Sequence, residues 1–501
     1  MPFDPEFASL PLAALADAAL SRARELGAQH ADLRVERIVS QSVDLRDGAV
    51  TGVADDTSVG LAVRVIVDGV WGFASHGELT PARAAATAQR AVAVARTLAP
   101  VAVERVERAD EPVYRGVEWI SAYTVDPFTV PIREKVELLT EWSQRLLAAD
   151  GVDHTHAGVA QVRECKFYAD LAGTSTTQQR VRIAPTFTAT AVDRAAGGFE
   201  TMSSLAPPVG RGWEYLDGTA GWGWDAELAQ VPDLLAEKTR APTVTAGAYD
   251  LVIDPTNLWL TIHESVGHAT EYDRAIGYEA AYAGSSFATP DQLGTLRYGS
   301  GHMHVTGDRT VPHGLATIGY DDDGVATGGW DLVRDGVLVG YQLDRTFAPR
   351  LGLERSNGCA YADSPHHVPI QRMANVSLQP DPVRDTSTAE LIGGVEHGIY
   401  VVGDKSWSID MQRYNFQFTG QRFFRIENGE LAGQLRDVAY QATTTDFWGS
   451  LDAVGGPSTW VLHGAMNCGK AQPGQVASVS HGCPSARFRG VNVLNTREEG
   501  S

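Results

Sequence analysis

A six-residue segment in the middle of the chain combines two histidines with a glutamate. It runs from His263 to His268, with Glu264 second and Gly267 fifth, and it follows a residue pattern that favours a helix start. Neutral imidazoles are zinc ligands, and a nearby carboxylate can take the proton of an attacking water molecule. Helical segments of this composition are found at the metal centres of hydrolases. The residue types therefore indicate metal-dependent hydrolysis.

The spacing of the two histidines leaves the ligand assignment open. They are five positions apart, which on a regular α-helix separates them by roughly 140° around the axis. A shared metal therefore requires the helix to end, tighten or bulge between them, and Gly267 is where this is easiest. On a regular helix Glu264 and His268 would be aligned instead. The other interpretation is a hydrogen bond between that pair on the helix surface, with His263 a core histidine.

Two further features accompany this segment. Glu271 and Asp273 follow it, giving the string His-Glu-x-x-Gly-His-x-x-Glu-x-Asp, and Cys468 lies in a turn of small residues near the C-terminus. The string and the cysteine closely resemble those of the TldD/PmbA family of metalloproteases. Because the chain keeps the histidine string, it resembles the metal-binding, TldD-like member. The resemblance covers most of the chain and includes residues 318–324, 337–341 and 369–375.

This resemblance implies a ligand set and a reaction. His263, His268 and Cys468 would bind one zinc ion per chain and leave a fourth position open for water, as catalytic zinc sites do. Glu264 would take the proton of that water while the ion polarises the scissile carbonyl group. A thiolate ligand lowers the effective charge of the ion, so the bound water should be less acidified than at a site built from histidines alone. Deprotonation of that water should then depend more on Glu264.

Three more residues could support the site. Glu271 and Asp273 could orient a ligand histidine, as carboxylates often do at metal sites, or they could be solvated acids at a helix end. Arg372 lies in one of the segments that resemble the family, which places it near the substrate cleft. It could bind a peptide carboxylate or pair with a structural acid.

The resemblance also implies partners. We expect a dimer, either of two copies or with a paralogous family member, enclosing a cleft for unfolded or small polypeptides. Such a substrate would lie extended and pair its backbone with a sheet edge. The alternative from another class is a non-catalytic peptide-binding or assembly subunit whose metal site is structural or vestigial. Three protein ligands plus water would favour the enzyme, and four protein ligands would favour the subunit.

Two segments depart from the family pattern. Residues 403–410 stand where relatives often have a glycine cluster, which affects the shape of the cleft. Residues 471–475 make the turn after Cys468 slightly longer than in relatives. Cys468 could instead join His481 and Cys483 in a separate structural zinc site, but no paired Cys-x-x-Cys supports this. The chain contains no nucleophile elbow, phosphate loop or dinucleotide fingerprint that would indicate another enzyme class.

The elements that must position these residues predict an α+β fold with two domains. In residues 1–224 we expect an antiparallel sheet with packed helices, because alternating apolar patterns are interspersed with helical patterns near residues 11–27, 80–100 and 131–147. Residues 225–501 should form a β-rich catalytic domain that carries the metal-site helix. The segment 197–224 connects them, and its large aromatic side chains favour a docked loop over a flexible tether.

Composition restricts the partners. The chain has 501 residues, a net charge of −21 and a pI near 5.1. An acidic surface argues against nucleic acid or an anionic membrane as the main partner. The N-terminus lacks the pattern of a secretory signal, and no apolar run is long enough to cross a bilayer. With only four cysteines, too few for a disulfide scaffold, we expect a cytoplasmic protein.

Overall fold

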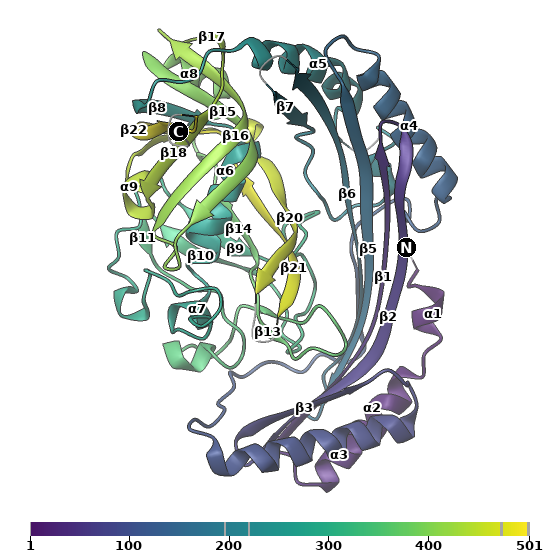
Figure 1. Cartoon of the computed structure of the whole chain (residues 1–501). Coiled ribbons are helices and arrows are strands. Elements are labelled where there is room, and N and C mark those ends of the chain that lie inside the picture. The colour runs from purple at the N-terminus through teal and green to yellow at the C-terminus, as the bar shows by residue number, and fades with distance from the viewer. Residues whose placement is uncertain (1, 195–196, 219–220, 471–473, 498–501) are drawn as a thin grey trace.

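The N-terminal half is built on one long, curved sheet (Figure 1). The computed structural model describes residues 2–194, 197–218, 221–470 and 474–497. The strands of this sheet are β1 (His30–Arg46), β2 (Ala49–Val67), β3 (Val70–His76), β4 (Val117–Ile120), β5 (His154–Asp170), β6 (Ser175–Asp193) and β7 (Gly198–Ser203). Their order is β3-β2-β1-β5-β6-β4, with β7 also paired to β6. The pairs are antiparallel except β4 with β6.

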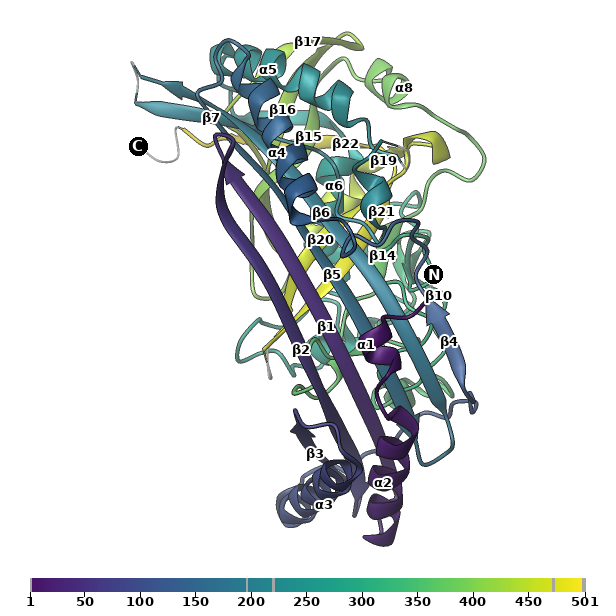
Figure 2. The same cartoon turned by 90° about the vertical axis from the view of Figure 1, so that its right-hand side faces the viewer.

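Helices pack against this sheet in two groups. They are α1 (Pro5–Ala8), α2 (Leu12–Glu25), α3 (Pro81–Leu98), α4 (Ile132–Leu147) and α5 (Trp224–Arg240). The first group, α2 and α3, shares a core of small and aliphatic side chains with β1, β2 and β3. The second group, α4 and α5, buries aromatic rings with β5 and β6, including Trp142, Phe187 and Trp224. Figures 1 and 2 show α1 and α4 on the face of the sheet that points away from the C-terminal half.

Strands of the C-terminal half close into a small barrel. They are β8 (Gly247–Ile253), β15 (His397–Ile409), β16 (Asn415–Glu427), β17 (Glu430–Leu435), β18 (Val438–Thr443), β19 (Leu451–Val454) and β22 (Ala486–Asn495). Because β15 pairs with both β8 and β16, the order β15-β8-β22-β18-β16 forms a ring, which β17 and β19 extend.

Shorter elements surround the barrel. The strands β9 (Val305–Asp308), β10 (Gly329–Arg334), β11 (Val337–Leu338) and β14 (Asn375–Leu378) form a second sheet, and β12 (Ala360–Tyr361) pairs with β13 (Ile370–Gln371). The hairpin of β20 (Val461–Lys470) and β21 (Gln475–Cys483) lies beside the first sheet in Figure 1. The helices are α6 (Pro255–Ile262), α7 (Tyr272–Ala275), α8 (Thr388–Gly393) and α9 (Thr444–Gly449).

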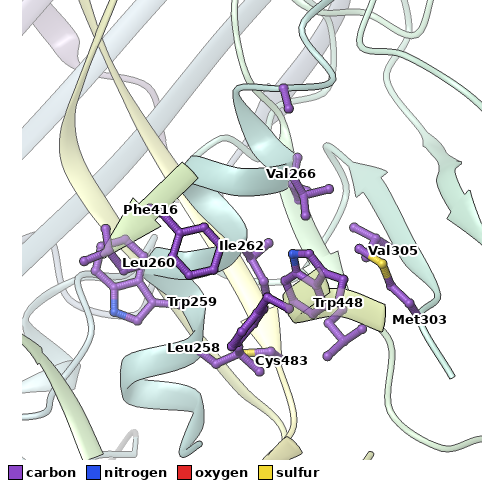
Figure 3. Close-up of a cluster of buried hydrophobic side chains, with 14 of the residues drawn as sticks. Leu258, Trp259, Leu260, Ile262, Val266, Met303, Val305, Phe416, Trp448 and Cys483 are labelled. Atoms are coloured by element: carbon purple, nitrogen blue, oxygen red, sulfur yellow. The ribbon is translucent and has the colours of Figure 1, made fainter. Parts of the chain in front are cut away.

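Helix α6 is the buried centre of the C-terminal half. All of its residues are buried, and Leu258, Ile262 and Val266 belong to the largest apolar cluster of the molecule. Figure 3 shows these side chains packed among Phe416 and Trp448, which come from distant parts of the chain. A helix that buries its whole surface is stable only inside a protein. The core therefore fixes the helix from which the candidate ligands project.

Buried charges join the two halves. Lys166 on β5 donates to Asp322 Oδ2 at 2.8 Å and to the carbonyl oxygen of Ala362 at 2.7 Å. Arg64 on β2 pairs with Asp323 in the same way. All four charged side chains are at most 6% exposed. Buried ions must be paired, so the sheet and the loops of the C-terminal half hold a definite relative position.

The α+β class is confirmed. Asp68-Gly69, Asp335-Gly336 and Asn428-Gly429 each close a hairpin. Asp322-Asp323-Gly324 also makes a turn, between the antiparallel bridge partners Tyr320 and Ala326, and this turn is buried against the first sheet. In the described part of the connecting segment 197–224, aromatic rings are docked as expected. Helix α5 shares the N-terminal core, and the domain limit at residue 224 stays a prediction.

Candidate metal centre

The candidate ligands lie where α6 continues into a π-helical turn. Asp254 begins the helix by accepting a hydrogen bond from the backbone N–H of Thr256 at 3.0 Å. From His263 to Gly267 the backbone is π-helical, and the N–H of His268 donates to the carbonyl oxygen of His263 at 3.0 Å. This bond spans five residues instead of four, so residues five apart come to the same side. It is the kind of bulge that the spacing of the histidines requires.

Three possible ligand atoms meet at this turn. One atom each from His263, His268 and Cys468 lies within 4.8 Å of the other two, and Cys468 Sγ is 3.7 Å from His268 Nε2. The cysteine comes from β20, whose pairing with β21 is irregular between Ala465 and Cys468. Such bulges redirect side chains. All three ligand residues are 5% exposed, so the group is buried.

Hydrogen bonds orient both imidazole rings. His268 Nδ1 lies 2.8 Å from Glu271 Oε2 and donates to it, which leaves the lone pair of His268 Nε2 free. His481 Nδ1 donates to the carbonyl oxygen of Val376 at 2.8 Å. Burial lowers the pKa of His481 well below its usual value, so its Nε2 is unprotonated and accepts from His263 Nδ1 at 2.7 Å. Because Nδ1 carries the single proton of a neutral His263 ring, Nε2 of His263 is unprotonated as well.

This donor set fits zinc. Burial lowers the pKa of His263, which keeps its ring neutral. Burial by itself would raise the pKa of Cys468, but His268 and Arg372 outweigh it and lower that pKa, which favours the thiolate. Two unprotonated ring nitrogens and a thiolate are ligands that zinc accepts in tetrahedral sites. Three such donors leave one position for a small molecule.

Glu264 lies beside the group as a carboxylate. Its Oε2 accepts a hydrogen bond from Arg413 Nη1 at 3.1 Å. Burial would raise the pKa of Glu264, but His268, His263 and Arg413 together lower it below its usual value. No hydrogen bond joins the other oxygen, Oε1, to a residue that the structure describes. That oxygen is therefore available to a water molecule in the cleft.

A cleft of about 630 Å³ opens on these groups between the two halves of the molecule. The N-terminal half contributes residues 184–186 of β6, and the C-terminal half contributes residues 464–469 of β20 together with Trp259 and Trp407. Residues from the divergent segment 403–410 thus line the cleft, as the sequence led us to expect.

The other predicted site residues lie behind the ligands. Glu271 is 1% exposed and contacts His268, whereas Asp273 contacts Lys470 Nζ at 2.8 Å and reaches no candidate ligand. Lys470 also donates to Glu271 Oε1 at 3.2 Å. Both acids are therefore buried and paired, and neither is a solvated acid at a helix end.

Arg372 lies on the far side of Cys468. It is 1% exposed and is not among the residues that line the cleft. Its Nη2 donates to the backbone carbonyl oxygen of Cys468. In this position the side chain supports the strand that carries the cysteine.

Sequence reasoning missed two residues of the site. His481 was considered only for a separate zinc site with Cys468 and Cys483, yet it contacts His263, and Cys483 is absent from the candidate ligand group. Arg413 follows the divergent segment directly, and no motif marked it. Both residues approach the site through tertiary contacts, so a sequence pattern carries no signal for either.

The site is buried, contains two histidines, one cysteine and a carboxylate, and opens to a cleft between the two halves. These features define a metal-dependent hydrolase. The C-terminal domain of the PmbA/TldA metallopeptidases matches residues 246–495, and domain 1 of the same family matches residues 31–95. The chain belongs to the PmbA/TldD family of metallopeptidases, and it is a metalloprotease.

Similarity to known proteins extends over nearly the whole chain. A metalloprotease of Methanothermobacter thermautotrophicus is 28% identical over 482 residues, which are 93% of this chain and 96% of that protein. A zinc metalloprotease TldD homolog of Saccharolobus solfataricus is 22% identical over 490 residues, which are 95% of this chain and 98% of the homolog. The crystal structure of TldE from Thermococcus kodakarensis has the same fold, with a TM-score of 0.69, 14% identity and coverage of 96% of this chain and 100% of TldE.

Two general expectations can also be compared with the structure. Within the described ranges, no helix has the length and apolar character needed to cross a membrane. The four cysteines are all buried and free, so Cys468 and Cys483 form no disulfide.

Proposed function

We propose that this protein is a zinc peptidase that cleaves unfolded or small polypeptides. His263, His268 and Cys468 would hold one zinc ion per chain, and Glu264 would act as the general base. The observation that carries the proposal is the convergence of three ligand atoms within 4.8 Å, next to a carboxylate that lines an open cleft. Bound zinc would polarise the scissile carbonyl group and acidify a water molecule.

Glu264 would transfer the proton during cleavage. Its free oxygen, Oε1, accepts a proton from water as the water oxygen bonds to the carbonyl carbon. The carboxyl group then gives that proton to the amide nitrogen, the C–N bond breaks, and a carboxylic acid and an amine are released, which in water become a carboxylate and an ammonium ion. Arg413 holds Oε2 throughout, so the carboxyl group keeps its orientation. Atoms and charges balance without any redox partner.

The shape of the cleft supports an extended substrate. In the described residues β20 pairs with β21 along one edge only, and residues 464–469 of β20 line the cleft. The other edge can form main-chain hydrogen bonds with a peptide, whatever the peptide's sequence. Residues 184–186 of β6 form the opposite wall, and the cleft, at about 630 Å³, is too small to hold a folded domain. Unfolded chains and short peptides are therefore the substrates we expect.

A non-catalytic peptide-binding subunit is the alternative. A structural zinc site would offer four protein ligands. Within the described part of the chain the candidate group has three members, and Glu264 is held by Arg413 next to it. The free position favours the enzyme. A dimer, of two copies or with a TldE-like paralogue, remains a proposal that rests on the family, and a cytoplasmic location remains one that rests on the sequence composition.

Replacing Glu264 tests the proposal. Glu264→Gln keeps the shape of the side chain but removes the base, so cleavage of unstructured casein should fall by about 100- to 10,000-fold. Zinc content, measured by metal analysis, should stay at one ion per chain. Glu430→Gln changes an exposed acid on β17 and should leave the rate unchanged.

Two results would contradict the proposal: normal cleavage by zinc-loaded Glu264→Gln, or full activity of the wild-type protein after a chelator has removed its metal.

A further inference from the structure

Arg413 brings a positive charge into the cleft. Among the described residues that line the cleft, it is the only lysine or arginine. Its Nη1 lies 3.1 Å from Glu264 Oε2, and Glu264 directly follows the candidate ligand His263. Only the Glu264 carboxylate therefore separates the guanidinium group from the place where a peptide would react.

Not every N–H group of the Arg413 side chain donates a hydrogen bond to a described residue. A guanidinium group carries five N–H bonds, which form a planar fork. Nη1 donates to Glu264 and Nη2 donates to the carbonyl oxygen of Ala283 at 3.2 Å. Nε is buried and has no hydrogen-bond partner among the residues that the structure describes. A buried donor without an acceptor is costly unless a ligand supplies the acceptor.

The backbone around Arg413 is held in an unusual conformation. Its φ is +63°, in the left-handed region that side chains other than glycine rarely adopt. The Asp410 carboxylate accepts hydrogen bonds from the backbone N–H groups of Gln412 at 3.0 Å and Tyr414 at 2.8 Å. Thr444 Oγ1 donates to the carbonyl oxygen of Arg413 at 2.8 Å. Strain of this kind persists where the surrounding contacts enforce it, and it is common at functional sites.

The chemistry of the site needs a second positive charge. As the carbonyl carbon becomes tetrahedral, its oxygen gains a full negative charge, and in a buried site this charge must be balanced. A thiolate from Cys468 lowers the net charge of the zinc centre, and Glu264 adds another negative charge nearby. Fixed donors that point at the developing charge give the largest single contribution in many hydrolases.

We propose that Arg413 is a catalytic residue that donates a hydrogen bond to the oxygen of the scissile carbonyl group as that oxygen becomes an oxyanion. The same guanidinium group holds Glu264 through Nη1, so it joins the base and the oxyanion in one fixed arrangement. This inference rests on the proposed peptidase function. The histidine string and Cys468 do not by themselves predict this role of Arg413.

The test compares zinc-loaded Arg413→Ala and Arg413→Lys with the wild-type protein. For Arg413→Ala, kcat on an unstructured peptide should fall by about 100- to 1000-fold, as when one oxyanion donor is removed. KM and zinc content should stay within a few-fold. Arg413→Lys keeps the charge without the fork, so it should lose less than Arg413→Ala. It also keeps the test valid if the alanine variant does not fold.

A second measurement separates this role from a merely structural one. A phosphinic pseudopeptide has a charged tetrahedral group in place of the scissile bond, so it mimics the oxyanion. Calorimetry should show that Arg413→Ala weakens binding of this compound by a factor close to the loss in kcat. Added guanidinium chloride at low millimolar concentration should restore part of the activity. Arg425→Ala, at the other end of β16, is the matched control and should change none of these values.

The outcomes are distinct. Unchanged phosphinate affinity, or an unchanged kcat in zinc-loaded Arg413→Ala and Arg413→Lys, overturns the role of Arg413 while the peptidase function stands. If the zinc-loaded wild-type protein cleaves no peptide, the proposed function itself fails.

Discussion

At the residue scale, the metal centre depends on which ring nitrogen carries a proton. For His263 the protonated nitrogen is set by two hydrogen bonds in series. His481 donates to the carbonyl oxygen of Val376, and the His263 ring donates to His481. His268 is set more directly by Glu271. Because a metal binds only the unprotonated nitrogen, these partners keep both rings ready for it. In the proposed site His481 would thus act on the metal without being a ligand.

Replacing His481 should weaken zinc binding. In His481→Leu the ring of His263 loses its acceptor and is free to turn or change tautomer, so zinc affinity should fall by about 10- to 100-fold. Competition with a fluorescent chelator measures this affinity directly. His463→Leu removes another buried histidine that stacks on Trp259 but does not contact His263, and it should retain the wild-type affinity. Equal affinities in the two variants would show that His481 does not position the ligand.

At the element scale, the π-helical turn decides whether two histidines five apart can face one point. Gly267 ends this turn in a crowded place, since a Cβ there would lie 2.7 Å from Met373 Sδ. Its φ is not in the left-handed region, so the need for glycine arises from packing and not from backbone conformation. Met373 belongs to a segment that resembles the family, and it closes over the turn.

Gly267→Ala should therefore lower the melting temperature, although alanine usually favours a helix by about 0.5–1 kcal/mol over glycine. The contact with Met373 should cost about 1–3 kcal/mol, as overpacking generally does. In a Met373→Ala background the contact is gone, and the same change should be neutral or stabilising. Thermal unfolding of the four proteins in this cycle is the measurement. An equal effect of Gly267→Ala in both backgrounds would contradict the packing explanation.

At the scale of the whole molecule, the cleft exists because the first sheet is held against the barrel and its loops. Lys166 is central to this contact, because it lies near Glu36, Glu164 and Asp322 at 3.4, 3.5 and 2.8 Å. Burial by itself would lower the pKa of Lys166, but Asp322 and the two glutamates outweigh it and raise the pKa. The lysine is therefore charged, and it balances acids from both halves.

Lys166→Met should destabilise the protein by about 3–5 kcal/mol, because it removes a buried positive charge from among three buried carboxylates. The cost should be smaller when Asp322→Leu is added, since one of these carboxylates is then removed. Thermal unfolding and the rate of limited proteolysis would both report the change. Lys405→Met, at an exposed position on β15, serves as the control and should have no effect. A melting temperature of Lys166→Met equal to that of the control would show that this network does not hold the halves together.

The sequence by itself determined the local elements and the chemical class. Residue periodicity predicted helices near residues 11–27, 80–100 and 131–147, and the structure has them as α2, α3 and α4. Turn residues such as Asp68-Gly69 close a hairpin between β2 and β3, because their backbone preferences act over a few residues. The histidine string indicated a metal site, since the residue types that bind zinc are few, and the resemblance to the family named Cys468 as the third candidate ligand.

Only the tertiary structure decided the rest. The spacing of the histidines left open whether the helix ends, tightens or bulges between them. The π-helical turn that forms there is held by residues distant in the chain, such as Gln342 and Tyr298. His481 and Arg413 reach the site from strands and loops far along the chain, and a short pattern cannot encode such contacts. That the turn at Asp322 is buried against the first sheet could not be predicted, because its partner Lys166 lies 156 residues away. Chemistry was readable from residue types, whereas geometry depends on long-range packing.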